Sequence, residues 1–318
     1  MRPDEGYIRY IVNPKAGASS SKFTDSQFRR YLLDKSYDVR VSVTASLEHA
    51  CRLAIGAAAD SNCGMVVVVG GDGTVREVAQ GLGGSDKVLL VVPCGTENLL
   101  ANELGFDERL ATVVRAFESG SVRCLDLGNA NGKCFTSIAG FGFDGEVVDR
   151  FSKQRTGHID HLDYLSPIWQ TFWAYRFHPI NVEVDGEEVF SGRGLVFVGN
   201  ISRYAVGLQI LHYANYGDGL LDVCIYRCSG RMHLVKHAVE TVLKLHANTR
   251  DVVYRQGREI TVSSDSTCIR TEIDGDPGPL LPVQIKVMPK AIRCLVPPGA
   301  KPAGIRTRIL RAVGLHLG

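Results

Sequence analysis

Residues 65–82 read MVVVVGGDGTVREVAQGL, so a run of five apolar residues leads directly into a glycine-rich loop. A continuous apolar run predicts a strand covered on both faces, as in a parallel sheet. The glycines of residues 70–74 permit a tight turn with exposed N–H groups, and a helix over Val75–Leu82 would point its positive dipole end there. The stretch therefore predicts a loop that holds phosphate groups, with Thr74 as hydroxyl donor and helix cap. The alternative is a plain strand-to-helix turn.

Strand and helix signals alternate over the first 126 residues. The expected strands are Tyr7–Val12, Val39–Thr44, Met65–Val69, Val88–Val92 and Val122–Asp126, and the expected helices are Thr24–Lys35, Leu47–Ala59, Val75–Leu82, Asn98–Leu104 and Leu110–Glu118. This alternation predicts an α/β domain with a doubly wound, mostly parallel sheet. Right-handed crossovers would place the loops that follow the strands along one edge, where ligands bind in such sheets.

Strand signals dominate after Asp126. The expected strands are Cys134–Ala139, Ile180–Val184, Glu188–Phe190, Leu195–Val198, Leu221–Tyr226, Glu259–Val262, Cys268–Ile273 and Val283–Val287, interrupted by helices around His158–Phe177 and Arg231–His246. We therefore expect a β-rich, sandwich-like second domain over residues 127–295. The first domain would cover residues 1–126 and be completed by residues 296–318.

The length, charge and cysteine content argue against several classes of protein. A length of 318 residues favours two domains, and a net charge of +2 gives no reason to expect a nucleic-acid partner. The sequence has no apolar window of about 20 residues and no secretory signal at its start, so no transmembrane segment is expected. Nine cysteines, an odd number without C-x-x-C spacing, fit free thiols in a reducing cytoplasm.

Two further polar loops follow predicted strands. Asn13-Pro14-Lys15-Ala16-Gly17 follows the first strand, and residues 93–98 (PCGTEN) follow the fourth. Each is ordinary turn chemistry alone, but three glycine-containing loops along the ligand-binding edge are stronger evidence. The chain lacks the G-x-G-x-x-G fingerprint of dinucleotide folds and the G-x-x-x-x-G-K-[ST] loop of other nucleotide-binding proteins.

The motifs N-P-x-x-G, G-G-D-G-T and P-x-G-T-x-N, in this order, resemble the lipid-kinase family that contains diacylglycerol kinases and sphingosine kinases. The resemblance covers nearly the whole chain and is closest to bacterial soluble members, while G-G-D-G-T alone is shared with NAD kinases and phosphofructokinases. It implies an NAD-kinase-like first domain and an active site in the cleft between the domains. It also implies that ATP is contacted by Asn13, Pro14, Lys15, Ala16, Gly17, Thr44, Gly71, Asp72, Gly73, Thr74, Val75, Arg76, Glu77 and Thr96.

A segment of the second domain, Asn215–Asp222, resembles the family's D-G-x-[LF]-D motif. The resemblance implies that Mg²⁺ is held by the carboxylate of Asp218 and by the main-chain carbonyls of Asn215 and Leu220, a donor set that suits a hard cation. Whether this metal is structural or catalytic stays open at this point. A plain loop before a strand is the alternative.

Residues 273–276 (IDGD) resemble the family's D-G-[ED] segment, which implies that Asp276 accepts the proton of the acceptor hydroxyl. Asp72 would be repelled by phosphate unless a metal ion intervened, so it is the second catalytic candidate, on the metal side or as base. Asp274 and Asp276 would share one side of an extended segment, whereas Gly275 and Pro277 favour a turn. A plain Asp-Gly turn without catalytic role is the alternative.

The expected activity is transfer of the γ-phosphoryl group of ATP, with Mg²⁺, to the hydroxyl of a lipid such as diacylglycerol, a sphingoid base or ceramide. The rivals are an NAD kinase-like phosphotransferase and a non-catalytic nucleotide- or lipid-binding regulator. The expected partner is a lipid substrate at a membrane surface, reached by transient peripheral contact from the cytoplasm. A homodimer is a further candidate.

Two segments could contact lipid. Trp169, Phe172 and Trp173 recur on one helix face, either packed on the sandwich or forming a wall for acyl chains. Residues 305–313 (IRTRILRAV) are basic and amphipathic, and either lie on an anionic membrane or close the first domain.

Overall fold

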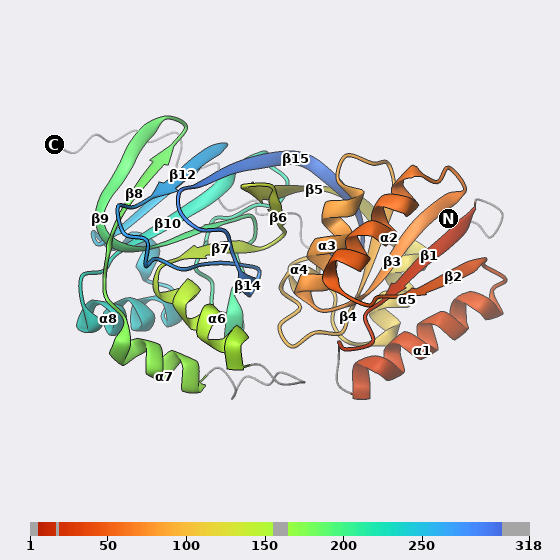
Figure 1. Ribbon diagram of the computed structural model, residues 1–318. Coiled ribbons are helices and arrows are strands. Elements are labelled where there is room, and N and C mark those ends of the chain that lie inside the picture. Colours follow the sequence, from red (N-terminus) through yellow and green to blue (C-terminus); the bar gives the residue numbers. More distant parts are fainter. Residues whose placement is uncertain (1–5, 17–18, 155–164, 301–318) are drawn as a thin grey trace.

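The computed structural model describes residues 6–16, 19–154 and 165–300, which form an α/β domain and a β-rich domain side by side (Figure 1). The first domain contains the strands β1 (Tyr7–Val12), β2 (Val39–Val43), β3 (Cys63–Gly70) and β4 (Val88–Pro93), and the helices α1 (Ser19–Asp34), α2 (Leu47–Ala59), α3 (Asp72–Leu82), α4 (Leu99–Glu103) and α5 (Leu110–Ser119). Strands and helices alternate along this part of the chain, as the sequence predicts.

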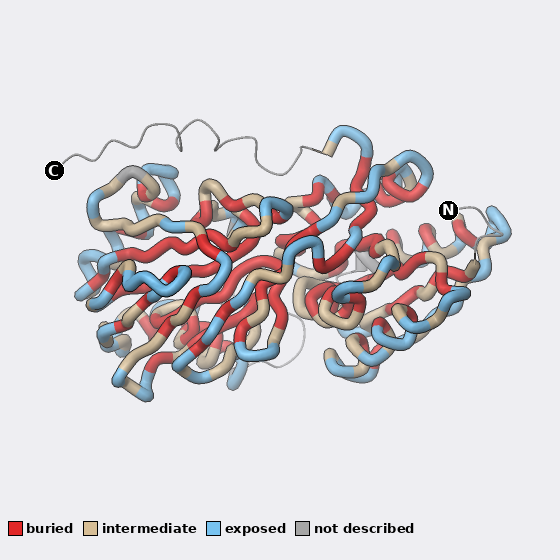
Figure 2. The backbone as a smooth tube through the Cα atoms, turned by 90° about the horizontal axis from the view of Figure 1, so that it is seen from above, coloured by how far each residue is buried: buried red, intermediate tan, exposed pale blue. Residues whose placement is uncertain are grey.

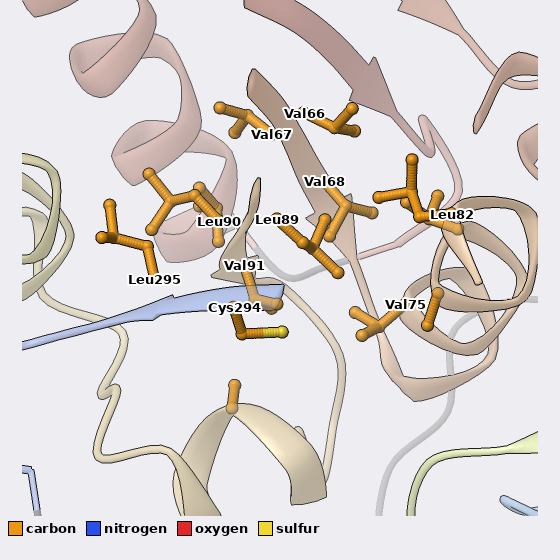
Figure 3. Packing of buried hydrophobic residues seen from close by; sticks show 14 of the residues in the cluster. Val66, Val67, Val68, Val75, Leu82, Leu89, Leu90, Val91, Cys294 and Leu295 are labelled. Carbon is orange, nitrogen blue, oxygen red and sulfur yellow. The ribbon is translucent and has the colours of Figure 1, made fainter. Parts of the chain in front are cut away.

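The sheet of the first domain has the order β2-β1-β3-β4, with every neighbouring pair parallel. It is extended by β15 (Val283–Val296), which runs parallel to β4, and by β5 (Ser121–Ala130), which is antiparallel to β15. The prediction of a mostly parallel sheet is therefore confirmed. Apolar residues of β3 and β4 are buried because helices cover the sheet on both sides; Val75 and Leu82 of α3 pack against them (Figure 3).

Within its described residues, the second domain contains many strands and the longer helices α6, α7 and α8. Its elements are β6 (Lys133–Phe135), β7 (Ile138–Phe141), α6 (Phe143–Gln154), α7 (Leu165–Ala174), β8 (Pro179–Val184), β9 (Glu187–Gly199), η2 (Ala205–Gly207), β10 (Leu221–Arg227), α8 (Arg231–Val242), η3 (His246–Asn248), β11 (Val252–Gly257), β12 (Glu259–Ser263), β13 (Thr271–Ile273) and β14 (Asp276–Pro277). One layer contains β8, β12 and β15, and the other contains β14, β13, β7, β9, β10 and β11. The predicted β-rich domain is confirmed.

Strand β9 links the two layers. Its first half pairs with β8 and its second half pairs with β10, so the strand leaves one sheet and enters the other near Gly192 and Gly194. Apolar residues of both layers meet in one core, which includes Val182, Val198 and Val223. In Figure 2 the buried backbone follows the strands of both domains, and the exposed backbone is mostly in turns.

Several expected element bounds are wrong in the second domain. The expected strand Cys134–Ala139 is split into β6 and β7, because the intervening main chain turns its amides toward Asp274. The expected strands Glu188–Phe190 and Leu195–Val198 are one strand, β9, and Cys268–Ile273 is reduced to β13. Helix α6 and strand β11 were not predicted.

The two domains share a long antiparallel pair. Strand β5 continues beyond Asp126 to Ala130, and β15 pairs with it over most of its length before joining β4 at Arg293 and Cys294. The chain thus returns to the first sheet through β15 itself. The predicted contribution of residues 301–318, including the basic segment at 305–313, lies outside the described residues.

Two expectations from composition can be compared with the structure. Within residues 6–16, 19–154 and 165–300, no helix is long and apolar enough to cross a membrane. None of the nine cysteines, all of which lie in described segments, forms a disulfide.

Two helical glycines give opposite predictions for stability. A Cβ at Gly81 of α3 would lie 2.6 Å from the main-chain oxygen of Cys51 and 2.7 Å from Cβ of Ala54, whereas a Cβ at Gly56 of α2 would meet nothing within 4 Å. We expect Gly81→Ala to lower the free energy of unfolding by about 1–3 kcal/mol through overpacking. Gly56→Ala should raise it by about 0.5–1 kcal/mol through helix propensity.

Urea unfolding of both variants beside the parent chain measures this difference. Equal stabilisation by the two substitutions would contradict the close packing of α2 on α3.

Candidate active site

Loops from three neighbouring strands meet at the carboxyl edge of the first sheet. The main-chain N–H of Asn13, after β1, donates to the Val69 carbonyl of β3 at 2.9 Å, and its side-chain Nδ2 donates to Oγ1 of Thr74 at 2.8 Å. After β4, the N–H of Cys94 donates to the Gly70 carbonyl at 3.0 Å. The three polar loops predicted from the sequence are therefore brought together.

Two of these loops touch through their main chains. A Cβ at Gly95 would lie 2.6 Å from Cα of Gly71, and a Cβ at Gly71 would lie 3.1 Å from Cα of Gly95. Only glycine permits this approach, which keeps side chains away from the start of α3. Asn98, at φ 48°, fixes the second loop by bonding both the N–H and the carbonyl of Gly95.

Helix α3 begins at Asp72, so the residues expected to form a loop make up its first turn. The prediction that Thr74 caps this helix is wrong: Gly71 occupies the N-cap position, and Thr74 lies inside the helix, where its hydroxyl accepts the bond from Asn13. The first-turn N–H groups and the positive end of the helix dipole lie at the junction of the three loops, which is a suitable place for phosphate groups.

Asp72 is a half-buried carboxyl at this junction. Burial, together with the negative charge of Asp274, raises its pKa to about 7, although it accepts hydrogen bonds from the N–H groups of Leu99 and Leu100. A carboxyl group that titrates near neutral pH can exchange a proton or balance the charge of a cation. Asp72 therefore has suitable chemistry for both roles predicted for it.

The segment with Asp274 and Asp276 forms a tight hairpin between β13 and β14. Asp274 and Gly275 have φ values of 47° and 80°, as a two-residue hairpin turn requires, so the extended arrangement with both carboxylates on one side is not adopted. The carboxylate of Asp274 is buried and accepts the N–H groups of Thr136, Ser137 and Ile138 at 2.8–3.0 Å. Asp274 thus ties the hairpin to the turn between β6 and β7.

Asp276 faces the first domain. Its Oδ2 lies 3.0 Å from Nη1 of Arg76, and a Cβ added to Gly73 would lie 3.2 Å from the same oxygen. Arg76 comes from α3 and is buried, and its Nη1 also donates to the Ile273 carbonyl at 3.1 Å. Burial opposes the charge of Arg76, but Asp274 and Asp276 hold its pKa above the ordinary value. The two acidic segments are thus joined across the domains.

Lys133 is a site residue that the sequence analysis missed. Its Nζ donates to the Pro277 carbonyl at 3.0 Å, next to Asp276. Burial and the positive charge of Arg76 lower the pKa of Lys133. The only sequence signal was a turn at Asn131-Gly132 before a short strand, which gives no hint of a contact 144 residues away.

A buried carboxyl pair supports the hairpin from the other side, and it too was missed. Glu272 accepts the N–H of Gly275 at 2.8 Å, and Asp144 accepts the hydroxyl of Tyr204. The remaining oxygens of Glu272 and Asp144 face each other over Gly140, whose missing Cβ leaves them room. Burial raises the pKa of both groups, and the negative charge of Asp144 raises the pKa of Glu272 further.

The predicted metal segment is held by Asp126. Its Oδ2 accepts the N–H of Gly219 at 2.7 Å, and its main-chain N–H donates to the Tyr216 carbonyl at 2.7 Å. Oδ1 of Asp218 accepts the N–H of Leu220 at 3.1 Å. Across the described residues, no three His, Cys, Asp or Glu side chains converge as a metal site. A site made from Asp218 and the carbonyls of Asn215 and Leu220 has another donor set and stays a prediction.

The other predicted nucleotide contacts lie around the same loops. The N–H of Thr44 donates to the Val12 carbonyl at 2.8 Å, and the N–H groups of Lys15 and Ala16 bond Asn13. Pro14, Lys15 and Thr96 are exposed, whereas Val75 is part of the core beneath the site. Glu77 bonds the guanidinium of Arg76 at 2.9 Å. Gly17 lies outside the described residues.

Comparisons with known proteins agree with this architecture. Residues 8–130 match the family described as the diacylglycerol kinase catalytic domain, and residues 137–296 match the YegS C-terminal NAD kinase beta sandwich-like domain. The chain is 29% identical over 304 residues to a diacylglycerol kinase of Mycobacterium tuberculosis, covering 93% of this chain and 97% of that one. It is 26% identical over 294 residues to a diacylglycerol kinase of Bacillus subtilis, covering 91% and 96%.

A solved structure has the same fold. The crystal structure of a diacylglycerol kinase from Bacillus anthracis superposes with a TM-score of 0.74 at 22% sequence identity, covering 93% of this chain and 98% of that chain. At this identity the likeness concerns the fold alone.

The raised pKa of Asp72 predicts a stability that depends on pH. In the unfolded chain Asp72 loses its proton near pH 4, and in the folded chain near pH 7, so its contribution to stability falls as the pH rises through that interval. The Asp72→Asn variant has no titrating carboxyl at this position, so it does not lose this stability as the pH rises. We expect the variant to be more stable than the parent by about 1–3 kcal/mol at pH 8, and to have little or no advantage at pH 4.

Thermal unfolding at both pH values, without nucleotide or metal, measures this effect. Asp86→Asn is the matched control, because the side chain of Asp86 is 80% exposed. A pH-independent difference between Asp72→Asn and the parent would show that Asp72 titrates normally.

Proposed function

The chain belongs to the diacylglycerol kinase catalytic-domain family, and on this premise we propose that it is a lipid kinase that transfers the γ-phosphoryl group of ATP to a lipid hydroxyl. The observation that carries the proposal is the contact of Asp276 with Arg76 and Gly73. It sets a carboxylate of the second domain beside the helix start that would hold the phosphates. The two curated relatives named as diacylglycerol kinases support a lipid as acceptor.

The first domain would bind ATP. The main-chain N–H groups at the start of α3 and the loop at Asn13–Gly17 would hold its phosphates, with Thr44, Thr96 and the residues Gly71–Glu77 completing the contacts. The close approach of Gly71 to Gly95 keeps the space above the helix free of side chains. Binding here would position the γ-phosphoryl group toward the hairpin of the second domain.

Mg²⁺ would accompany the nucleotide and neutralise charge on the transferring phosphoryl group. The residues present are compatible with a cation, because burial and the negative charge of Asp274 raise the pKa of the Asp72 carboxyl, and a bound cation would offset that negative charge. We assign Asp72 to this metal side. A second cation would be held by Asp218 with the carbonyls of Asn215 and Leu220, and the bonds of this loop to Asp126 favour a structural role there.

Asp276 would accept the proton of the attacking hydroxyl. Its Oδ2 already has one strong partner, Nη1 of Arg76 at 3.0 Å, which fixes the position of the carboxylate. The other carboxylate oxygen of Asp276, Oδ1, can then accept the proton of a hydroxyl group. Most of the rate would come from alignment of the hydroxyl with the γ-phosphoryl group, since positioning dominates phosphoryl transfer.

Phosphoryl transfer from γ-labelled ATP to a mixed lipid extract in detergent micelles tests the proposal. We expect a labelled lipid phosphate whose formation requires Mg²⁺ and falls by a factor of about 10² or more in Asp72→Asn. Mass spectrometry of the product distinguishes diacylglycerol, sphingoid base and ceramide as acceptors.

Two results would contradict the proposal. Label transferred to NAD and not to lipid would favour the NAD kinase-like activity. Tight ATP binding without turnover, across the whole lipid extract, would favour a regulator that uses the same fold.

A further inference from the structure

Helix α7 has its apolar residues on the outside. It buries Pro167 and Thr171 against the protein, while Trp169 and Trp173 are 64% and 55% exposed. Leu165 is also exposed, as is Ile168. Of the two alternatives for this helix face, the packing of both tryptophans on the sandwich is therefore wrong. An amphipathic helix of a soluble protein normally turns its large apolar residues inward, so this orientation needs a reason.

Helix α8 has the same inverted arrangement. Its inward residues are polar: Nε2 of His237 bonds the Arg227 carbonyl at 3.0 Å, and Oγ1 of Thr241 bonds the hydroxyl of Tyr226 at 2.9 Å. Its outward residues are Met232, Val235, Val239 and Val242, which are 42–79% exposed. At spacings of three, four and three residues they lie on one side of the helix.

The two helices are joined. Arg231, the first residue of α8, donates from Nε to the Phe172 carbonyl of α7 at 3.0 Å, and its guanidinium lies 5.6 Å from the ring centre of Trp173. In Figure 1 both helices lie at the outer side of the second domain, away from the first domain's sheet. We call the exposed apolar side chains of α7 and α8, with Arg231 between them, the docking face.

The charges beside the docking face identify the kind of partner. Residues 165–178 and 231–246 contain four arginines or lysines and only one acidic residue, Glu240. Glu240 is paired with Lys236 and His237, and Lys236 also pairs with Asp251. Among the described residues, Arg176, Arg231 and Lys244 have no acidic partner, and they leave the surroundings basic. A symmetric dimer would set these basic groups against their own copies, whereas an anionic surface would attract them. Tryptophan next to arginine and lysine is typical of side chains at a membrane interface.

The docking face is also connected to the active site. Helix α6 packs against α7 on one side and against β13 and β14 on the other, and β14 carries Asp276. Helix α6 therefore connects the docking face to the strand that carries the proposed proton acceptor. A lipid hydroxyl that stays in its bilayer would need such an arrangement.

We infer that the docking face of α7 and α8 places the chain on the surface of an anionic lipid bilayer, an inference that rests on the proposed function as a lipid kinase.

The tryptophans provide a direct test, because Trp169 and Trp173 are the two tryptophans of the chain and both belong to the docking face. The full chain is mixed with vesicles of phosphatidylcholine and phosphatidic acid, neither of which carries an alcohol group, so the vesicles contain no acceptor lipid. We expect a blue shift of tryptophan emission and co-sedimentation with the vesicles. Binding should weaken with added salt and with vesicles of phosphatidylcholine alone.

Paired variants separate the docking face from general surface hydrophobicity. Val239→Ser with Val242→Ser leaves both tryptophans in place and should lower the vesicle partition coefficient at least tenfold. The matched control is Leu33→Ser with Ile55→Ser, on α1 and α2, whose parent side chains are 56% and 54% exposed. Turnover of acceptor lipid in detergent micelles should be unchanged in both double variants.

No binding to anionic vesicles, or equal loss in the two double variants, would overturn the inference. So would a dimer in sedimentation velocity that only the α8 variant dissociates, since a second copy would then cover the face. The vesicles hold no acceptor, so docking can succeed even if no lipid is phosphorylated. Activity in micelles can likewise persist if docking fails.

Discussion

The buried guanidinium of Arg76 is the interaction on which the site depends. An arginine inside a protein is costly unless every charge and donor is matched, and Arg76 meets the Ile273 carbonyl, Asp276 and Glu77. It lies two residues after the G-G-D-G-T motif, on the helix that would hold the phosphates. Since its partners at 273 and 276 belong to the second domain, the same side chain would order the proposed phosphate side and acceptor side of the reaction.

The rest of the fold holds the contact between Arg76 and the hairpin of Asp276 in place. The paired strands β5 and β15 run through both domains and set their relative position. Asp274 and Glu272 then fix the hairpin internally, by bonds to the amides of residues 136–138 and of Gly275. Asp276, the proposed proton acceptor, is thus supported by strands and a turn with several hydrogen bonds. Such support gives the fixed geometry that phosphoryl transfer requires.

The sequence predicted those parts of the molecule that local patterns determine. Apolar runs such as residues 65–69 predicted the parallel sheet, and the three polar loops were correctly expected along one edge of it, because burial and glycine geometry act over a few residues. Contacts between residues far apart in the sequence could not be predicted from local patterns. Lys133, Asp144 and Glu272 join the site only through pairing of strands far apart in the chain. Periodicity likewise showed that Trp169 and Trp173 share a helix face, but could not show that the face points outward.

The role of Asp276 as proton acceptor is tested most directly by the turnover number of Asp276→Asn, with Asp276→Glu and Asp72→Asn measured beside it. The account predicts that Asp276→Asn lowers kcat by a factor of about 10²–10⁴ while the affinity for ATP is retained, because a single proton transfer is lost. Asp276→Glu should keep a larger part of the activity. Full turnover in Asp276→Asn, together with loss of activity in Asp72→Asn, would contradict the account and assign the base to Asp72.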